Sequence, residues 1–202
     1  MKKVQLFTLI AFMVILISGK PVKYGIGDVV MDFKLKNIDG KAVALSDYKT
    51  SKGAIVVFDC NTCPYSKAYN DRIIALNKKY SSQGFPVLAI NANDPQVSPG
   101  DSFEEMAAYA KRKNYDFPYL VDETQEVARA FGATNTPHVF VLKRDGKDFR
   151  VAYIGTVDNN SRDASAVSKK YVEDAVDALL AGQQVPTPTT KAIGCSIKWR
   201  NT

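Results

Sequence analysis

The chain has 202 residues, of which 46% are hydrophobic and 24% charged. These values are ordinary for a soluble globular protein with a sizeable core, and they exclude a disordered chain, a fibre and a multispan membrane protein. The formal net charge is +6, or +4 without residues 1–19 (25 basic against 21 acidic residues); the basic residues are scattered and no recognition motif accompanies them, so we predict no nucleic-acid partner.

Residues 1–19 have the layout of a secretory signal. Lys2 and Lys3 precede an apolar run over residues 4–17, which is shorter than a comfortable membrane span. Small residues follow, but a large aliphatic residue stands where a cleavage site needs a small one, so an uncleaved N-terminal membrane anchor is the alternative. Both readings place the domain outside the cytoplasm, in the periplasm or a similar oxidising compartment.

The next elements alternate strands with a long helix. Residues 29–35 and 41–45 flank an Asp-Gly turn and predict a hairpin. The β-branched run at residues 54–58 predicts a central strand buried on both faces. Residues 64–80 carry apolar side chains at helical spacing, and residues 86–91 predict a second buried strand.

Two capping boxes predict the starts of the following helices: Ser102 with Glu105, and Asp122 with Gln125. The first of these helices runs to about residue 113 and the second stops at Gly132, with a short strand between them at residues 119–121. A second hairpin is predicted at residues 138–142 and 149–154, and a last helix at residues 165–181. This alternation predicts one α/β domain, residues 24–182, with a mixed sheet covered by helices on both faces.

Residues 183–202 form a Pro/Thr-rich tail. Pro186 and Pro188 exclude a helix there. The tail nevertheless carries apolar residues in alternation, namely Ile193, Cys195, Ile197 and Trp199. We therefore expect it to pack on the domain as an extended segment.

The spacing of two of the three cysteines is the most informative feature. Cys60 and Cys63 form a C-x-x-C at a predicted strand-to-helix junction, with Pro64 in the first helical turn. The unpaired N–H groups and partial positive charge of a helix N-terminus stabilise a thiolate there. We expect Cys60, as the outer residue, to attack, and the more buried Cys63 to resolve the mixed disulfide.

The second feature is Thr136-Pro137 at the entrance to a strand, a position compatible with a cis peptide bond. A C-x-x-C at a strand-to-helix junction followed by such a Thr-Pro resembles the thioredoxin fold. In that fold the proline is cis and lies against the C-x-x-C, and the backbone before it holds an extended substrate. The resemblance implies that Thr136 and Pro137 bind substrate.

The resemblance is closer to the AhpC/TSA-like, or peroxiredoxin-like, redoxins of the thioredoxin family. The motifs that carry it cover residues 24–200: FDCNTCPYSKAYNDRI, INANDP, Tyr153-Ile154-Gly155 with Asp158, AIGCSIKW, and the N-terminal hairpin, which resembles an extension shared by peroxiredoxins and periplasmic reductases. The chain departs from thioredoxins at Asp59, where they carry Trp, and at Ala54, where they carry a buried acid. The peroxiredoxin Pro-x-x-x-Thr-x-x-Cys signature fits neither Cys60 nor Cys63.

These features predict an exported thiol–disulfide oxidoreductase that works through Cys60 and Cys63, with no organic cofactor and no metal. Its partners would be thiol- or disulfide-containing proteins and an unidentified upstream redox protein. Cys195 is either a small buried apolar residue or a third redox thiol.

Two alternatives stay open. One is a peroxidase that uses Cys195 as its resolving thiol. The other is a metal-binding module built from the three cysteines and His138, the only histidine. Four polar residues at or near predicted strand ends could line a ligand site or shape turns: Asp59, Asn91, Asn93 and Asp94.

Overall fold

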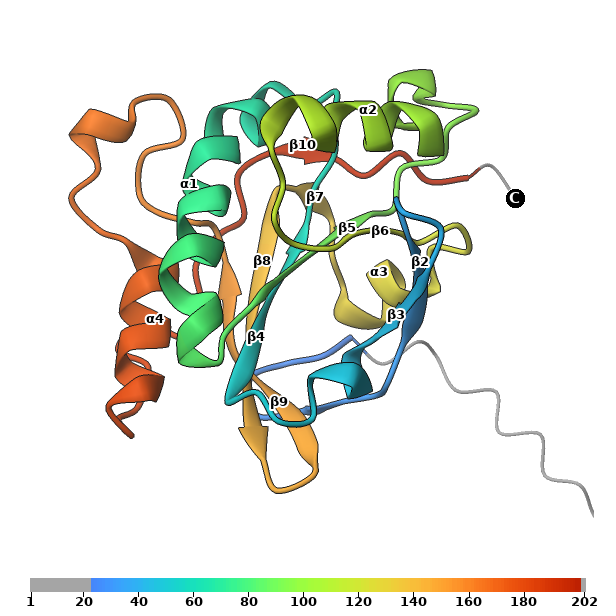
Figure 1. Ribbon diagram of the computed structural model, residues 1–202. Helices are drawn as coiled ribbons and strands as arrows, with labels where there is room; N and C mark the ends of the chain where they lie inside the picture. The colour runs from blue at the N-terminus through green and yellow to red at the C-terminus, as the bar shows by residue number, and fades with distance from the viewer. Residues whose placement is uncertain (1–22, 201–202) are drawn as a thin grey trace, which may run out of the picture.

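The computed structural model describes residues 23–200 (Figure 1). The predicted signal or anchor at residues 1–19 lies outside this range. Within residues 23–200, no helix is both long enough and apolar enough to cross a membrane.

A mixed eight-stranded sheet forms the centre, in the order β1-β9-β8-β4-β5-β6-β2-β3. Strands β4, β5 and β6 pair in parallel, and the other neighbouring strands of the sheet pair antiparallel. The strands are β1 (Val29–Val30), β2 (Lys34–Asn37), β3 (Ala42–Ala44), β4 (Gly53–Phe58), β5 (Val87–Asn91), β6 (Tyr119–Val121), β8 (His138–Asp145) and β9 (Asp148–Gly155). A separate two-stranded pair joins β7 (Asn135–Thr136) to β10 (Cys195–Ser196).

Helices cover both faces of the sheet, which confirms the predicted fold class. They are α1 (Pro64–Tyr80), α2 (Phe103–Lys113), α3 (Glu126–Phe131) and α4 (Tyr171–Leu180). Helices α1, α2 and α4 pack their apolar residues into one core, and α3 packs with the N-terminal segment into the other. Figure 1 shows α1 and α4 side by side, and the Tyr80 hydroxyl of α1 donates to Asp177 of α4 over 2.7 Å.

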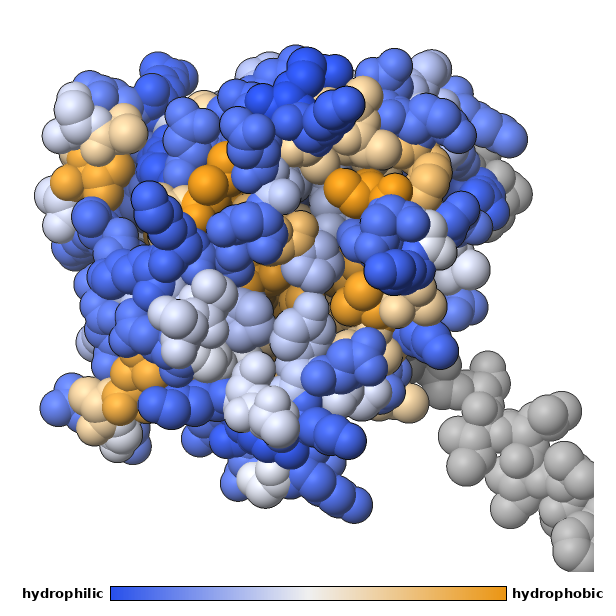
Figure 2. All heavy atoms as spheres, in the orientation of Figure 1, coloured by the Kyte–Doolittle hydropathy of each residue, from blue (hydrophilic) through white to orange (hydrophobic). Residues whose placement is uncertain are grey.

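Strand β4 shows how the sequence produces these two layers. Its six residues are all buried, because helices cover it on both sides. Successive side chains point to opposite faces of a strand. Ile55 and Val57 therefore enter the α1 core, while Val56 and Phe58 enter the α3 core. The face of the molecule in Figure 2 is mostly hydrophilic, with apolar residues in separated patches, as this burial requires.

The prediction for the N-terminal hairpin is partly wrong. Its turn and second strand are confirmed, since β2 pairs with β3. Val29 and Val30, however, pair with β9 at the opposite edge of the sheet. The chain leaves β1 because Asp32 accepts a hydrogen bond from the amide of Ser46 (2.8 Å) and Phe33 buries its ring in the α3 core.

Two helix starts also differ from prediction. The Asp122 carboxylate accepts the amide of Ala128 (2.8 Å), the Gln125 amide donates to the Asp122 carbonyl oxygen (3.1 Å), and α3 begins only at Glu126. The last helix begins at Tyr171 rather than near residue 165. The Asn159 side chain accepts the amides of Ser168 and Lys169, both over 3.0 Å, and so holds the preceding residues in a loop.

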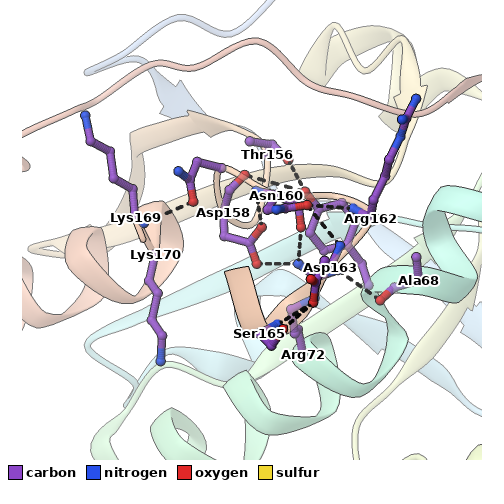
Figure 3. A network of polar contacts seen from close by, with 12 residues as sticks. Ala68, Arg72, Thr156, Asp158, Asn160, Arg162, Asp163, Ser165, Lys169 and Lys170 are labelled. Carbon is purple, nitrogen blue, oxygen red and sulfur yellow. Dashed lines mark hydrogen bonds and ion pairs between the residues drawn. The ribbon is translucent and has the colours of Figure 1, made fainter. Parts of the chain in front are cut away.

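A polar network ties this loop to α1 (Figure 3). Arg72 of α1 forms an ion pair with Asp158 (2.6 Å) and donates to the carbonyl oxygen of Asn160 (2.7 Å). Asp158 is almost fully buried, and its other carboxylate oxygen accepts the amide of Asn160. Removing one partner of such a pair leaves the other charge desolvated and uncompensated.

We therefore expect Asp158→Ala to lower the free energy of unfolding by about 3 kcal/mol. The matched control is Asp145→Ala, which removes the exposed ion pair with Arg150 (2.7 Å) and should cost less than about 1 kcal/mol. Urea unfolding followed by circular dichroism measures both. Equal losses in the two variants would contradict a structural role for the buried pair.

Candidate active site

The C-x-x-C lies between β4 and α1, as predicted. Cys63 is the N-cap of α1 and has an extended backbone (φ −69°, ψ 127°), and Pro64 is the first helical residue. Both sulfur-bearing residues are enclosed: Cys60 is 2% exposed and Cys63 is 3% exposed. The structure thus differs from the expectation that Cys60 is the outer residue of the pair.

The predicted Thr-Pro partner faces these cysteines. The Thr136–Pro137 peptide bond is cis. The hydroxyl of Thr136 lies 3.1 Å from Cys60 Sγ, and its carbonyl oxygen lies 3.1 Å from Cys63 Sγ. The structure therefore brings together four of the residues that the sequence singled out, although they come from positions more than seventy residues apart.

The C-terminal tail brings Cys195 to the same place. Strand β10 pairs antiparallel with β7, which sets Cys195 opposite Thr136 (Figure 1). Cys195 Sγ lies 2.7 Å from Cys63 Sγ, and the Cys195 amide donates to Cys63 Sγ over 3.4 Å. Cys195 is partly exposed, unlike the other two cysteines. The backbone that was expected to hold a substrate is thus occupied by the chain's own tail.

The three thiols of the site differ in pKa. Hydrogen bonds from the Cys60 and Cys195 thiols, and from the backbone amides of Ser66 and Cys195, lower the pKa of Cys63 to about 4 despite its burial. The Cys63 sulfur and desolvation raise the pKa of Cys60. Desolvation, followed by the bond to Cys63, raises the pKa of Cys195 to about 11.

The lowered pKa therefore belongs to Cys63, whereas the sequence predicts it for Cys60. The main cause is the hydrogen bond from the Cys60 thiol to the Cys63 sulfur. The Cys195 thiol and the amide of Ser66, in the first turn of α1, lower the pKa of Cys63 further.

A buried carboxylate that sequence reasoning missed fixes the loop between the cysteines. Asp101 accepts the amide of Asn61 (2.7 Å) and the hydroxyl of Thr62 (2.8 Å). It also accepts the Ser98 hydroxyl and the side-chain amides of Asn91 and Asn93. These donors outweigh desolvation and lower the pKa of Asp101. The two asparagines, noted in the sequence for their place after a strand, hold this acid.

Asp59 is the second buried acid. It is 2% exposed, and its Oδ1 has no hydrogen-bond partner. Burial raises the pKa of Asp59 to about 6, and the Ser66 hydroxyl partly counteracts it. The carboxyl group next to Cys60 can therefore take up or release a proton close to neutral pH.

His138 does not join the cysteines. Its ring lies against Phe140 (centroids 4.7 Å apart), and its Nδ1 accepts the Thr134 amide over 3.4 Å. Burial lowers the pKa of His138 to about 4. Among residues 23–200, no group of three or more His, Cys, Asp or Glu side chains is arranged to hold a metal ion. The metal-binding alternative has no support in this part of the chain.

The reduced protein should hold one thiolate at neutral pH, because Cys63 alone has a strongly lowered pKa. Thiolate absorbance in the far ultraviolet should disappear on acidification with a midpoint near pH 4. The Cys63→Ser variant should lack this transition, and Cys195→Ser, which keeps a donor beside Cys63, should retain it. A midpoint at the ordinary thiol value of about 8.5 would contradict the assignment.

Comparisons with known proteins agree with this geometry. A family model described as the AhpC/TSA family matches residues 26–148. The thiol-disulfide oxidoreductase ResA of Geobacillus thermodenitrificans is 26% identical over 125 residues, which cover 60% of this chain and 66% of that protein. The chain thus matches just under two thirds of the length of this relative.

Solved structures show the same fold. An uncharacterized conserved protein from Geobacillus kaustophilus has a TM-score of 0.81 and 36% identity, covering 89% of this chain and 94% of its own. An exposed lipoprotein thioredoxin of Streptococcus pneumoniae has a TM-score of 0.54 and 21% identity, covering 75% of this chain and 99% of its own. The predicted thioredoxin-like fold is confirmed.

Proposed function

This chain belongs to the AhpC/TSA family, and we propose that it is an exported thiol–disulfide oxidoreductase whose redox centre is the Cys60–Cys63 pair. The observation that carries the proposal is the placement of two buried cysteines of one C-x-x-C at the N-terminus of α1, with Thr136 3.1 Å from both sulfurs. The relative ResA is named as a thiol-disulfide oxidoreductase, which supports the proposal.

The reaction is thiol–disulfide exchange. The pair cycles between two thiols and one intramolecular disulfide, which transfers two electrons to or from a partner. In the mechanism expected from sequence, the mixed disulfide forms on Cys60 and Cys63 releases it. The low pKa of Cys63 favours its attack on the mixed disulfide, because a thiolate is the attacking form and a thiol is not.

The partners would be proteins with exchangeable thiols or disulfides, together with an upstream redox protein that resets the pair. Export rests on residues 1–19, whose charged start and apolar run are those of a signal or membrane anchor. Thr136 and Pro137 keep the place expected for substrate binding, beside both cysteines. An extended partner could pair with Thr136 only after β10 had left it.

A glutathione redox titration tests this function. Alkylation and mass spectrometry of the full chain should reveal a reversible Cys60–Cys63 disulfide. Cys60→Ser and Cys63→Ser should each lower the rate of insulin disulfide reduction by at least about 100-fold, because neither variant can form the pair. Asp145→Asn, far from the cysteines on an exposed hairpin, serves as the control and should retain the wild-type rate. If the pair stayed reduced at every glutathione ratio, the proposal would fail.

Peroxidase activity is the second candidate, and the 2.7 Å approach of Cys195 to Cys63 favours it, since it supplies a resolving thiol. We nevertheless expect hydrogen peroxide to be consumed no faster than by free cysteine, because the chain lacks the Pro-x-x-x-Thr-x-x-Cys signature. Peroxide consumption that survives Cys60→Ser and is lost in Cys63→Ser would instead support the peroxidase.

A further inference from the structure

The tail is fastened to the domain on both sides of Cys195. Before it, Pro188 and Thr190 bond to the backbone of Ile154, with distances of 3.0 and 2.9 Å. The Thr190 hydroxyl lies 2.6 Å from the Tyr153 hydroxyl and accepts the Thr156 amide over 3.0 Å. These contacts end five residues before Cys195 and limit how far the tail can swing away.

A second set of contacts begins two residues after Cys195. Ile197 is buried in the α3 core, and its amide donates to the carbonyl oxygen of Thr134 over 3.1 Å. The Lys198 amide donates to Asn93 (2.8 Å), and the Gln125 side chain bonds to the backbone of Lys198 and Arg200. Cys195 is thus held against Cys63 by a segment anchored at each end.

Close packing at Gly194 reinforces this placement. A Cβ atom built on Gly194 would lie 2.1 Å from the Thr136 carbonyl oxygen. Real Cβ atoms do not approach a backbone atom so closely, so any larger residue would push the tail off β7. The residue next to Cys195 is therefore the one that permits the sulfur–sulfur approach.

The anchored tail also decides which sulfur a partner can reach. Cys60 and Cys63 are 2% and 3% exposed, and the tail fills the edge of Thr136 beside them. Cys195 alone among the three cysteines is open to solvent in part. We propose that Cys195 is the relay thiol through which the buried Cys60–Cys63 pair exchanges electrons with partner proteins, an inference that rests on the function proposed above.

The relay consists of three thiol–disulfide exchange steps. Cys195 gives its proton to the Cys63 thiolate, 2.7 Å away, as its sulfur attacks a partner disulfide. A mixed disulfide forms on Cys195, and the released partner thiolate takes the proton back from Cys63. The Cys63 thiolate attacks Cys195 Sγ, forming the Cys63–Cys195 disulfide and releasing the second partner thiolate. Cys60 attacks Cys63 Sγ, forming the Cys60–Cys63 disulfide and freeing Cys195, whose raised pKa means that it ends as the thiol with the proton that Cys60 loses. The partner disulfide is reduced to two thiols, and the pair is oxidised.

The reverse direction uses the same contacts. When a partner thiolate attacks the exposed sulfur of a Cys63–Cys195 disulfide, the leaving group is Cys63. A thiol of low pKa leaves faster, and the N-terminus of α1 stabilises the Cys63 thiolate. The partner sulfur that fits this route lies on a mobile segment or a small molecule, since the extended-chain site along β7 is occupied.

Stopped-flow oxidation by oxidised glutathione tests the relay. In Cys195→Ser, the Cys60–Cys63 disulfide should form at least about tenfold more slowly than in the wild type. At equilibrium, the ratio of reduced to oxidised glutathione at which half of the pair is oxidised should agree with the wild-type ratio within about twofold. Ser196→Ala, which changes the neighbouring exposed side chain, should match the wild type. Glutathione should be trapped on Cys195 in Cys63→Ser.

The outcomes separate the relay from the function on which it rests. If Cys195→Ser forms the Cys60–Cys63 disulfide at the wild-type rate, or if Cys63→Ser traps glutathione on Cys60, the relay is wrong and the oxidoreductase proposal stands. If the wild type forms no Cys60–Cys63 disulfide at all, the oxidoreductase proposal fails, and the relay fails with it.

Discussion

The site depends on one short pairing, that of β10 with β7. It sets Cys195 opposite Thr136, on the residue whose hydroxyl and carbonyl oxygens contact Cys60 and Cys63. Two backbone segments far apart in the sequence thereby enclose the C-x-x-C and bring a third sulfur to it. Without this pairing Cys63 would lose its contact with the Cys195 thiol and the hydrogen bond from the Cys195 amide, and the buried pair would become open to partners.

A thiolate in a buried site needs compensation, because burial favours the neutral form. Cys63 finds it at the start of α1, where the first-turn amides have no partner within the helix, and in the two neighbouring thiols. Asp101 contributes indirectly: by accepting the Asn61 amide and the Thr62 hydroxyl it fixes the loop that presents Cys60 to Cys63. Two features therefore define the site: the low pKa of Cys63, and the loop between the two cysteines, which Asp101 holds in place.

The parts of the fold that were predictable are those encoded by neighbouring residues. The buried run of β4 and the helical spacing of α1 are local patterns, and both elements were predicted within a residue. The same holds for the C-x-x-C and for Thr136-Pro137. What the sequence could not show depends on contacts at long range. Val29 pairs with β9 rather than with its own hairpin, and Gln125 turns its side chain to the tail instead of capping a helix. The role of Asp101 arises only where its loop meets Asn61, and the low pKa of Cys63 depends on the Cys60 and Cys195 thiols that the fold brings to it.

On the proposed route, the buried sulfurs exchange electrons through a defined series of disulfides. Peptide mapping of the full chain, quenched with acid at intervals after one equivalent of oxidised glutathione is added to the reduced protein, tests it most directly. The Cys63–Cys195 disulfide should appear first and then give way to Cys60–Cys63. A protein whose three cysteines carry glutathione independently, with no disulfide among them at any time, would contradict it.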